Sequence, residues 1–328
     1  YAAKKARAEA VKLKPQIIIS GLPRTGSTFL HQLLSKDPNC RFLSLWEMNK
    51  PIPFPTKDTY LTDPRIEQAK KLRKFGNVFT SNWIKYIEKC HDSDGAEVEE
   101  EICLFLHTGC FPLFFPHFPK YFEWYLKPNK QPAYQYLKHF LKLSQLHHPP
   151  SSHWVLKTPI HGYHFGELLE EFNENRLVVV LHRDPVKIAP SFCQLIMLSA
   201  APGLRDVQND HTMCKELFGK HSLWQLKPIA EMMTNVRKEL PKQVENDCIY
   251  DVEFDELVKD PMGTVEKIYR KAGLVLTAQA KKEMQTYLHK NAQERRKGKG
   301  SEHFPSSLEQ FGLEENDVKE LFKDYRKS

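Results

Sequence analysis

Residues 16–28 read QIIISGLPRTGST, and this stretch decides the fold. Its first five residues form a short, β-branched apolar run, which is typical of a strand buried in a parallel sheet. The next eight residues hold two glycines and a proline, which predicts a turn, and apolar residues then recur at helical spacing from Phe29 to Leu34. We therefore predict a strand, a glycine loop and a helix in that order.

Three further apolar runs predict strands. They span residues 154–156, 176–181 and 248–252, and the first two end in charged loops. Helical segments are expected at 66–75, 134–146 and 263–272, and a charged helical lead at 2–14, stopped by Pro15. Short buried strands that alternate with helices predict an α/β fold, with a P-loop-like central parallel β-sheet flanked by helices. Functional side chains are then expected on the loops after the carboxyl ends of the strands.

The chain of 328 residues is long enough for one large domain or two ordinary ones. We find no internal repeat and predict a single domain over residues 1–328. Residues 15–36 form its glycine loop and helix, residues 37–150 an insert rich in prolines and aromatic residues, and residues 151–328 the rest of the sheet and a closing loop at the C-terminal end.

The composition excludes several classes of protein. Hydrophobic residues make up 41% and charged residues 27% of the chain, which argues against disorder, collagen and coiled coil. The apolar runs are far too short to span a bilayer, so we expect no stable membrane insertion. The net charge of +7 favours an anionic partner but does not name it.

Seven cysteines are scattered along the chain, with no CxxC pair and no metal-ligand spacing. We read them as reduced thiols that lie mostly in the core, and expect a cytoplasmic protein. The chain starts at Tyr1, so an anchor or signal trimmed from in front of it stays open.

The glycine loop is close to the phosphate-binding pattern GxxxxGK[ST]. Ser27 stands where nucleotide triphosphatases have a lysine, and the nearest cation is Arg24. A helix N-terminus that presents free amides, hydroxyls and an arginine is nevertheless suited to an anion. The alternative is that the two glycines only make a tight turn.

Several separated motifs resemble those of the sulfotransferases that use 3′-phosphoadenosine 5′-phosphosulfate (PAPS). Residues 18–28 look like the family's 5′-phosphosulfate loop, and residues 181–191 like its 3′-phosphate motif, in which an arginine precedes a serine by eight positions, as Arg183 precedes Ser191 here. The remaining matches are the Lys-Thr-Pro-x-His segment at 157–161, the segment 254–261, the loop 296–298 and the C-terminal stretch 311–325.

The resemblance implies roles for individual residues. Arg24 and Lys157 would contact the sulfuryl group and the bridging oxygen, and Phe29 would lie near the adenine. The amides and hydroxyls of Thr25, Gly26, Ser27 and Thr28 would hold the 5′-phosphate, and Pro23 and Arg24 would also belong to the donor-binding site. The 3′-phosphate would be held by Arg183, Ser191, Arg296, Lys297 and Gly298.

The general base is less clear, because Pro159 stands where the cytosolic branch of the family has its catalytic histidine. Two candidates remain, Glu47 and His161, and we favour Glu47. The plain alternatives are that Glu47 pairs with a lysine such as Lys50 and that His161 is a packing histidine. The acidic run 99–101 reads most simply as a solvated helix face, although one of its members could line the acceptor site.

Aromatic residues crowd the stretch Phe105–Tyr125. They would suit the wall of an acceptor pocket for an apolar or ring-containing alcohol. The alternative, which we favour, is that they form the core of a cap subdomain.

Taken together, the resemblance implies an enzyme that moves a sulfuryl group from PAPS to a hydroxyl of a small molecule, carbohydrates and lipid-like alcohols included, and releases adenosine 3′,5′-bisphosphate (PAP). No metal is required, because the donor carries no triphosphate. Nucleic acid is not expected as a partner, and a homo-oligomer stays open. Two alternative functions remain: a P-loop kinase or NTPase, and a non-catalytic nucleotide-binding protein on the same scaffold.

Overall fold

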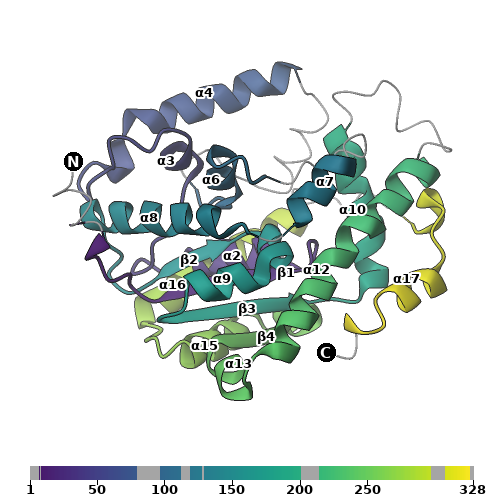
Figure 1. The fold of residues 1–328 in the computed structure, drawn as a ribbon. Helices are drawn as coiled ribbons and strands as arrows, with labels where there is room; N and C mark the ends of the chain where they lie inside the picture. The colour runs from purple at the N-terminus through teal and green to yellow at the C-terminus, as the bar shows by residue number, and fades with distance from the viewer. Residues whose placement is uncertain are drawn as a thin grey trace.

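The computed structural model describes residues 7, 9–79, 97–111, 119–127, 129–200, 214–296 and 307–325. At its centre is a parallel four-stranded sheet with the order β2-β1-β3-β4 (Figure 1). The strands are β1 (Gln16–Gly21), β2 (Trp154–Lys157), β3 (Arg176–His182) and β4 (Ile249–Glu253). All four strands coincide with the predicted apolar runs, with ends that differ by a residue at most. The predicted α/β fold class is confirmed.

Helices follow each strand and fill the insert between β1 and β2. The first strand leads into α2 (Ser27–Leu34), and the insert contains α3 (Leu45–Asn49), η1 (Tyr60–Thr62), α4 (Pro64–Phe79), α6 (Ile102–His107), α7 (Pro119–Leu126) and α8 (Gln131–His147). Between β2 and β4 lie η2 (Pro159–His164), α9 (Phe165–Glu171), α10 (Pro185–Ala200), η5 (Cys214–Gly219), α12 (Lys220–Glu239) and α13 (Lys242–Cys248). The chain continues through α14 (Phe254–Lys259), α15 (Pro261–Lys271), α16 (Ala278–Arg296), η6 (Glu309–Phe311) and α17 (Glu315–Leu321).

The sheet is covered on both faces, because its side chains alternate between two cores. Ile18, Leu156 and Val178 pack against apolar residues of α8, α9, α10 and α12. Their neighbours in the strands, such as Ile17 and Val179, face the opposite way and pack against α2, α15 and α16. The result is a three-layer arrangement, with α8 and α9 on one side of the sheet and α15 and α16 on the other (Figure 1).

The insert is attached to the sheet through the short segment 41–44. Arg41 forms a parallel bridge with Trp154 at the start of β2, and Ser44 forms an antiparallel bridge with Val98. The amide of Glu99 donates to the carbonyl of Leu43, with an N to O distance of 2.8 Å. These bonds bring the acidic run 99–101 to the edge of the sheet next to β2.

The predicted segments 66–75 and 134–146 lie inside the longer helices α4 and α8, and two other predicted boundaries differ from the observed ones. The charged lead was predicted as a helix up to residue 14, but residues 11–14 are irregular, because the amide side chain of Gln145 bonds the carbonyl of Lys12 and the amide of Lys14. The helix predicted from 263 begins two residues earlier, at Pro261. Its start is set by Asp260, whose carboxylate accepts from the amide of Gly263 and caps the helix.

Within the described ranges, no helix has both the length and the apolar composition that a membrane-spanning segment needs.

Candidate active site

The glycine loop turns sharply between β1 and α2. Gly21 has φ +131°, and a Cβ atom there would lie 2.5 Å from the carbonyl oxygen of Leu181 in the adjacent strand. Gly26, with φ +85°, is the residue before α2, and no side chain of the described residues caps that helix. Both positions therefore need glycine, and the first turn of α2 keeps its amides for a ligand.

Arg24 also has a left-handed backbone, with φ +69°. This conformation costs about 1 kcal/mol for a residue other than glycine, and such strain tends to be retained at functional positions. It lets the Nε atom of Arg24 donate to the Oγ atom of Ser191 at 2.8 Å, while its own carbonyl accepts from a terminal nitrogen of Arg183 at 3.0 Å. The two loops predicted to bind phosphate groups thus meet, although they lie far apart in the sequence.

Arg183 follows β3 directly and lies over the ring of Phe254, 4.1 Å from its centroid. Its buried Nε atom has no hydrogen-bond partner in the described part of the chain. Burial lowers the pKa of Arg183, and the neighbouring positive charge of Arg24 lowers it further. Two close arginines with an unused buried donor form a site that an anion would stabilise.

Lys157 is the last residue of β2, and its side chain is 1% exposed. Its Nζ atom donates to the Oγ1 atom of Thr28 at 3.1 Å and is paired with the carboxylate of Glu100, whose side chain is 15% exposed. Lys157 therefore connects the glycine loop to the insert. Because it is buried and paired, Lys157 is not a solvated loop lysine.

Glu101 lies completely buried behind this pair. Its Oε2 atom accepts from the amide of Lys157 at 2.8 Å, and its Oε1 atom lies 2.7 Å from Nε2 of His161. The other ring nitrogen of His161 lies 3.1 Å from the hydroxyl of Tyr134 on α8. The prediction of a solvated helix face for residues 99–101 is therefore wrong at Glu100 and Glu101, because cationic and N–H partners from β2 and η2 compensate their burial.

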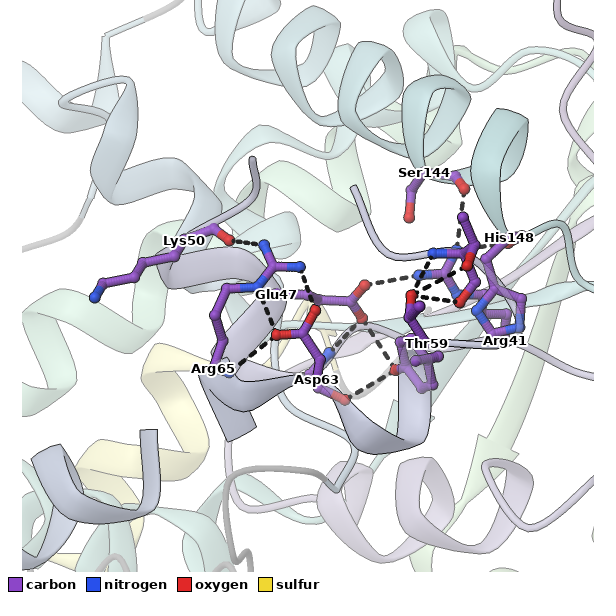
Figure 2. A network of polar contacts seen from close by, with 11 residues as sticks. Arg41, Glu47, Lys50, Thr59, Asp63, Arg65, Ser144 and His148 are labelled. Atoms are coloured by element: carbon purple, nitrogen blue, oxygen red, sulfur yellow. Dashed lines mark hydrogen bonds and ion pairs between the residues drawn. The ribbon is translucent and has the colours of Figure 1, made fainter. Parts of the chain in front are cut away.

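Glu47 belongs to a different network, which Figure 2 shows. Its carboxylate accepts from Arg41 at 2.7 Å, from the amide of Ser44 at 2.9 Å and from the hydroxyl of Tyr60 at 3.2 Å. Ser44 and Glu47 form a capping box at the start of α3. Burial raises the pKa of Glu47, and the charge of Arg41 opposes this rise. Lys50 instead donates to Gln68, so the suggested Glu47–Lys50 pair is absent from these described residues.

Arg41 is itself enclosed in this network. Its guanidinium lies between the rings of Tyr60 and Trp154, at 5.1 and 4.9 Å from their centroids. It also donates to the carbonyls of Ser144 and His148 on α8 and just after it (Figure 2). The Arg41–Glu47 pair therefore joins α3 and α8 to the edge of the sheet.

Of the other predicted residues, Pro23 is buried, and Ser27 is half-buried as the first residue of α2. Thr25 is buried, and its hydroxyl donates to the carbonyl of Leu22 at 2.7 Å. The hydroxyl is thus used within the turn, so the backbone amide of Thr25 is the group that it would offer to a ligand. The ring of Phe29 lies 6.4 Å from that of Tyr287 on α16. Arg296 is exposed at the end of α16, and Lys297 and Gly298 lie outside the described residues.

The aromatic stretch 105–125 contributes mainly to the core. Phe105, Phe122 and Tyr125 are buried in the cluster that also contains Leu137 and Tyr163. Trp124 is an exception at 46% exposed. Residues 112–118, which include Phe114, Phe115 and Phe118, lie outside the described part of the chain. Where it is described, the stretch fits the predicted cap core better than a pocket wall.

Sequence reasoning gave Glu100, Glu101 and Tyr134 too little weight. The acidic run directly before the apolar residues of α6 was a usable signal, because buried carboxylates next to a strand end need cationic partners. For Tyr134 no signal distinguishes it from the other aromatic residues of α8. Across the described ranges, no three His, Cys, Asp or Glu side chains are grouped so that they could hold a metal ion.

Comparisons with known proteins agree with this arrangement. A model described as "Sulfotransferase family" matches residues 15–278. Among solved structures, sulfotransferase STF1 from Mycobacterium tuberculosis H37Rv has a TM-score of 0.78 and 26% identity, with 98% of this chain and 79% of that chain covered. For sulfotransferase STF9 from Mycobacterium avium the TM-score is 0.76 and the identity 22%, with 100% and 80% covered. No curated protein matches this chain. Because the family match spans most of the sequence, the chain belongs to the sulfotransferase family.

Proposed function

We propose that this protein transfers a sulfuryl group from PAPS to a hydroxyl of a small molecule, carbohydrates and lipid-like alcohols included, and releases PAP. One observation carries the proposal. Arg24 donates to Ser191, and Arg183 donates to the carbonyl of Arg24. The loop that resembles a 5′-phosphosulfate site and the motif that resembles a 3′-phosphate site therefore lie together at the N-terminus of α2. A nucleotide with phosphates on both its 3′ and 5′ positions fits this pair of sites.

The donor would be held mainly by backbone and cationic groups. The first turn of α2 has no side-chain cap, so the amides of residues 25–28 can hold the 5′-phosphate at the positive end of the helix dipole. The unused Nε atom of Arg183 and the hydroxyl of Ser191 would hold the 3′-phosphate. Phe29, in contact with Tyr287, would border the adenine. Arg296, Lys297 and Gly298 would close over the 3′-phosphate.

The chemistry requires positive charge where the donor gains negative charge. In an in-line displacement the acceptor oxygen bonds to sulfur as the bond from sulfur to the 5′-phosphate oxygen breaks. Lys157, already in contact with Thr28 at the glycine loop, and the terminal nitrogens of Arg24 would stabilise the leaving oxygen and the sulfuryl oxygens.

The same geometry favours Glu100 as the general base. Glu100 contacts Lys157 and is partly exposed, so its carboxylate can take the acceptor's proton close to the reacting sulfur. Glu47, which the sequence favoured, has its carboxylate engaged by Arg41, Ser44 and Tyr60. His161 has both ring nitrogens bonded inside the protein. We therefore propose Arg24, Lys157 and Glu100 as catalytic residues.

A transfer assay tests the proposal. The purified chain is incubated with ³⁵S-labelled PAPS and a panel of phenols, sugars and long-chain alcohols, and labelled product and PAP are measured. We expect one acceptor class to be labelled, with a loss of at least about 10²-fold in Arg24→Ala and Lys157→Ala. Substitutions that leave transfer within a few-fold of the parent would show that the catalytic assignment is wrong.

A further inference from the structure

His161 lies behind the candidate active site and has no free ring nitrogen. It is completely buried, its Nε2 atom is 2.7 Å from Oε1 of Glu101, and its Nδ1 atom is 3.1 Å from the hydroxyl of Tyr134. A group that touches the acceptor must offer a free nitrogen to it. In this geometry His161 can act on the reaction only through its partners.

Glu101 connects the histidine to the reacting groups. Its second oxygen accepts from the backbone amide of Lys157 at 2.8 Å, at the end of β2. Its neighbour in the same turn, Glu100, is paired with the side chain of Lys157. One carboxylate thus holds the backbone that carries Lys157 and belongs to the same turn as Glu100. A shift of Glu101 would move both.

The hydrogen bonds define the protonation of the ring. A carboxylate only accepts, so Nε2 of His161 carries a proton toward Glu101. The hydroxyl of Tyr134 is buried and has no other partner within the described ranges, so its proton is directed to Nδ1 of His161. In this arrangement of donors and acceptors, Nε2 carries a proton and Nδ1 accepts one, so the hydrogen bonds run from Tyr134 through His161 to Glu101.

We propose that Tyr134, His161 and Glu101 form a positioning relay. This relay is a chain of hydrogen bonds that keeps Lys157 and Glu100 in place beside the glycine loop. The relay joins α8, η2 and the start of α6 to the end of β2. Its catalytic relevance rests on the proposed function. His161 is here a positioning residue, whereas the sequence indicated it as a candidate general base.

Substitution of His161 separates positioning from base catalysis. The side-chain nitrogen of glutamine is as many bonds from Cα as Nε2 of histidine, so His161→Gln can still donate to Glu101, whereas His161→Leu cannot. We expect His161→Leu to lose about 10- to 100-fold in kcat, and His161→Gln to recover kcat to within about 3-fold of the parent. A direct base would be lost in both variants, so equal losses would overturn the proposal.

A double-mutant cycle tests whether His161 acts through Glu101. If it does, His161→Leu should lower kcat little further in a Glu101→Gln background, because the relay is already disturbed. Losses that multiply would contradict the relay. His153→Leu is the matched control: this buried histidine precedes β2 at its other end and contacts Ser152 and Tyr269. It should lower thermal stability without lowering kcat of the folded enzyme.

A spectroscopic measurement tests the relay without turnover. In ¹⁵N spectra of the histidine rings, with His161 assigned by its absence in His161→Gln, the parent should show the Nε2–H tautomer. In Glu101→Gln the amide oxygen must serve the Lys157 amide, so its NH₂ group faces the ring and the tautomer should switch to Nδ1–H. An Nδ1–H tautomer in the parent, or no switch in Glu101→Gln, would overturn the relay. Because this readout needs neither donor nor acceptor, it separates failure of the relay from failure of the proposed function, which PAP binding reports.

Discussion

The carboxylate of Glu100 is paired with the ammonium of Lys157, although the two residues are 57 positions apart in the chain. The pair brings a candidate base from the insert together with a cation from the end of β2, within reach of Thr28 on the glycine loop. In sulfuryl transfer, a proton leaves the acceptor as negative charge develops on the leaving oxygen. A carboxylate beside a lysine at one point can serve both needs.

Glu100→Gln should remove the base and leave the donor site intact. We expect kcat to fall by at least about 10²-fold at saturating donor, with the Kd for PAP changed by less than about 3-fold. Glu99→Gln is the matched control, because its amide oxygen can still accept from the amide of Glu100, as the carboxylate of Glu99 does now. Single-turnover kinetics and calorimetry measure the two quantities. Equal and mild losses in both variants would exclude Glu100 as the base.

Glu47→Gln should affect stability more than turnover. The substitution leaves the guanidinium of Arg41 buried without its counterion, which costs about 3 kcal/mol in comparable buried pairs. We expect the free energy of unfolding in urea to fall by that order, and kcat per folded molecule to stay within about 3-fold of the parent. The opposite pattern, a large loss of turnover at unchanged stability, would restore Glu47 as the general base.

Arg24→Gly should abolish transfer with little change in stability. Glycine adopts the positive φ of position 24 without strain, and loss of the charge removes the repulsion that lowers the pKa of Arg183. These gains offset the entropy that glycine adds to the unfolded chain and the loss of the hydrogen bond to Ser191, so we expect the free energy of unfolding to change by less than about 1 kcal/mol. Asn175→Gly, at another positive-φ position outside the site, is the control and should keep full activity. A clear destabilisation by Arg24→Gly would mean that the loop is not strained at Arg24.

The stability of the fold should fall between about pH 6.5 and pH 4 because of His153. Burial lowers the pKa of His153 to about 4, below the value of about 6.5 in an unfolded chain. The unfolded state therefore binds the proton first, so the stabilising contribution is complete above pH 6.5 and is lost as the pH falls toward 4. The slope is about 1.4 kcal/mol per pH unit.

Urea unfolding of the parent and of His153→Gln at pH 7, 6 and 5 measures this slope. On acidification the free energy of unfolding should fall less in the variant than in the parent. The difference should be about 1.4 kcal/mol per pH unit, which corresponds to one proton. Parallel pH profiles for the two proteins would show that His153 is not protonated on unfolding.

The strands and the glycine turn between β1 and α2 could be predicted because their signals are local. The three isoleucines of β1, the glycines at 21 and 26, and the valines of β3 each act through their own segment. The approach of the glycine loop to Arg183 at the end of β3 fits the rule that the carboxyl ends of parallel strands share one edge, whereas the contact of Arg24 with Ser191 on α10 was not predicted. The resemblance then added PAPS as the proposed anion, which the glycine loop alone did not indicate.

The environment of the acidic residues could not be predicted in the same way. Glu47 and Glu101 are both charged residues in polar stretches, and nothing local says that either is buried. Their burial depends on partners from distant segments: Arg41 stacked on Trp154 for the first, and His161 with the Lys157 amide for the second. The roles of Arg296, Lys297 and Gly298 stay predictions.

The central claim is that the donor site binds a nucleotide with a 3′-phosphate. Calorimetric titration with PAP tests it most directly, with adenosine 5′-phosphate and ATP plus magnesium titrated for comparison, because only a PAPS-dependent enzyme needs the 3′-phosphate. We expect tight binding of PAP, much weaker binding of adenosine 5′-phosphate and no dependence on magnesium. Arg183→Ala should weaken PAP binding by about 10- to 100-fold and leave the affinity for adenosine 5′-phosphate unchanged, since a buried charged hydrogen bond to phosphate is worth about 1.5 to 3 kcal/mol. Binding of ATP with magnesium in preference to PAP, or of neither nucleotide, would contradict the account.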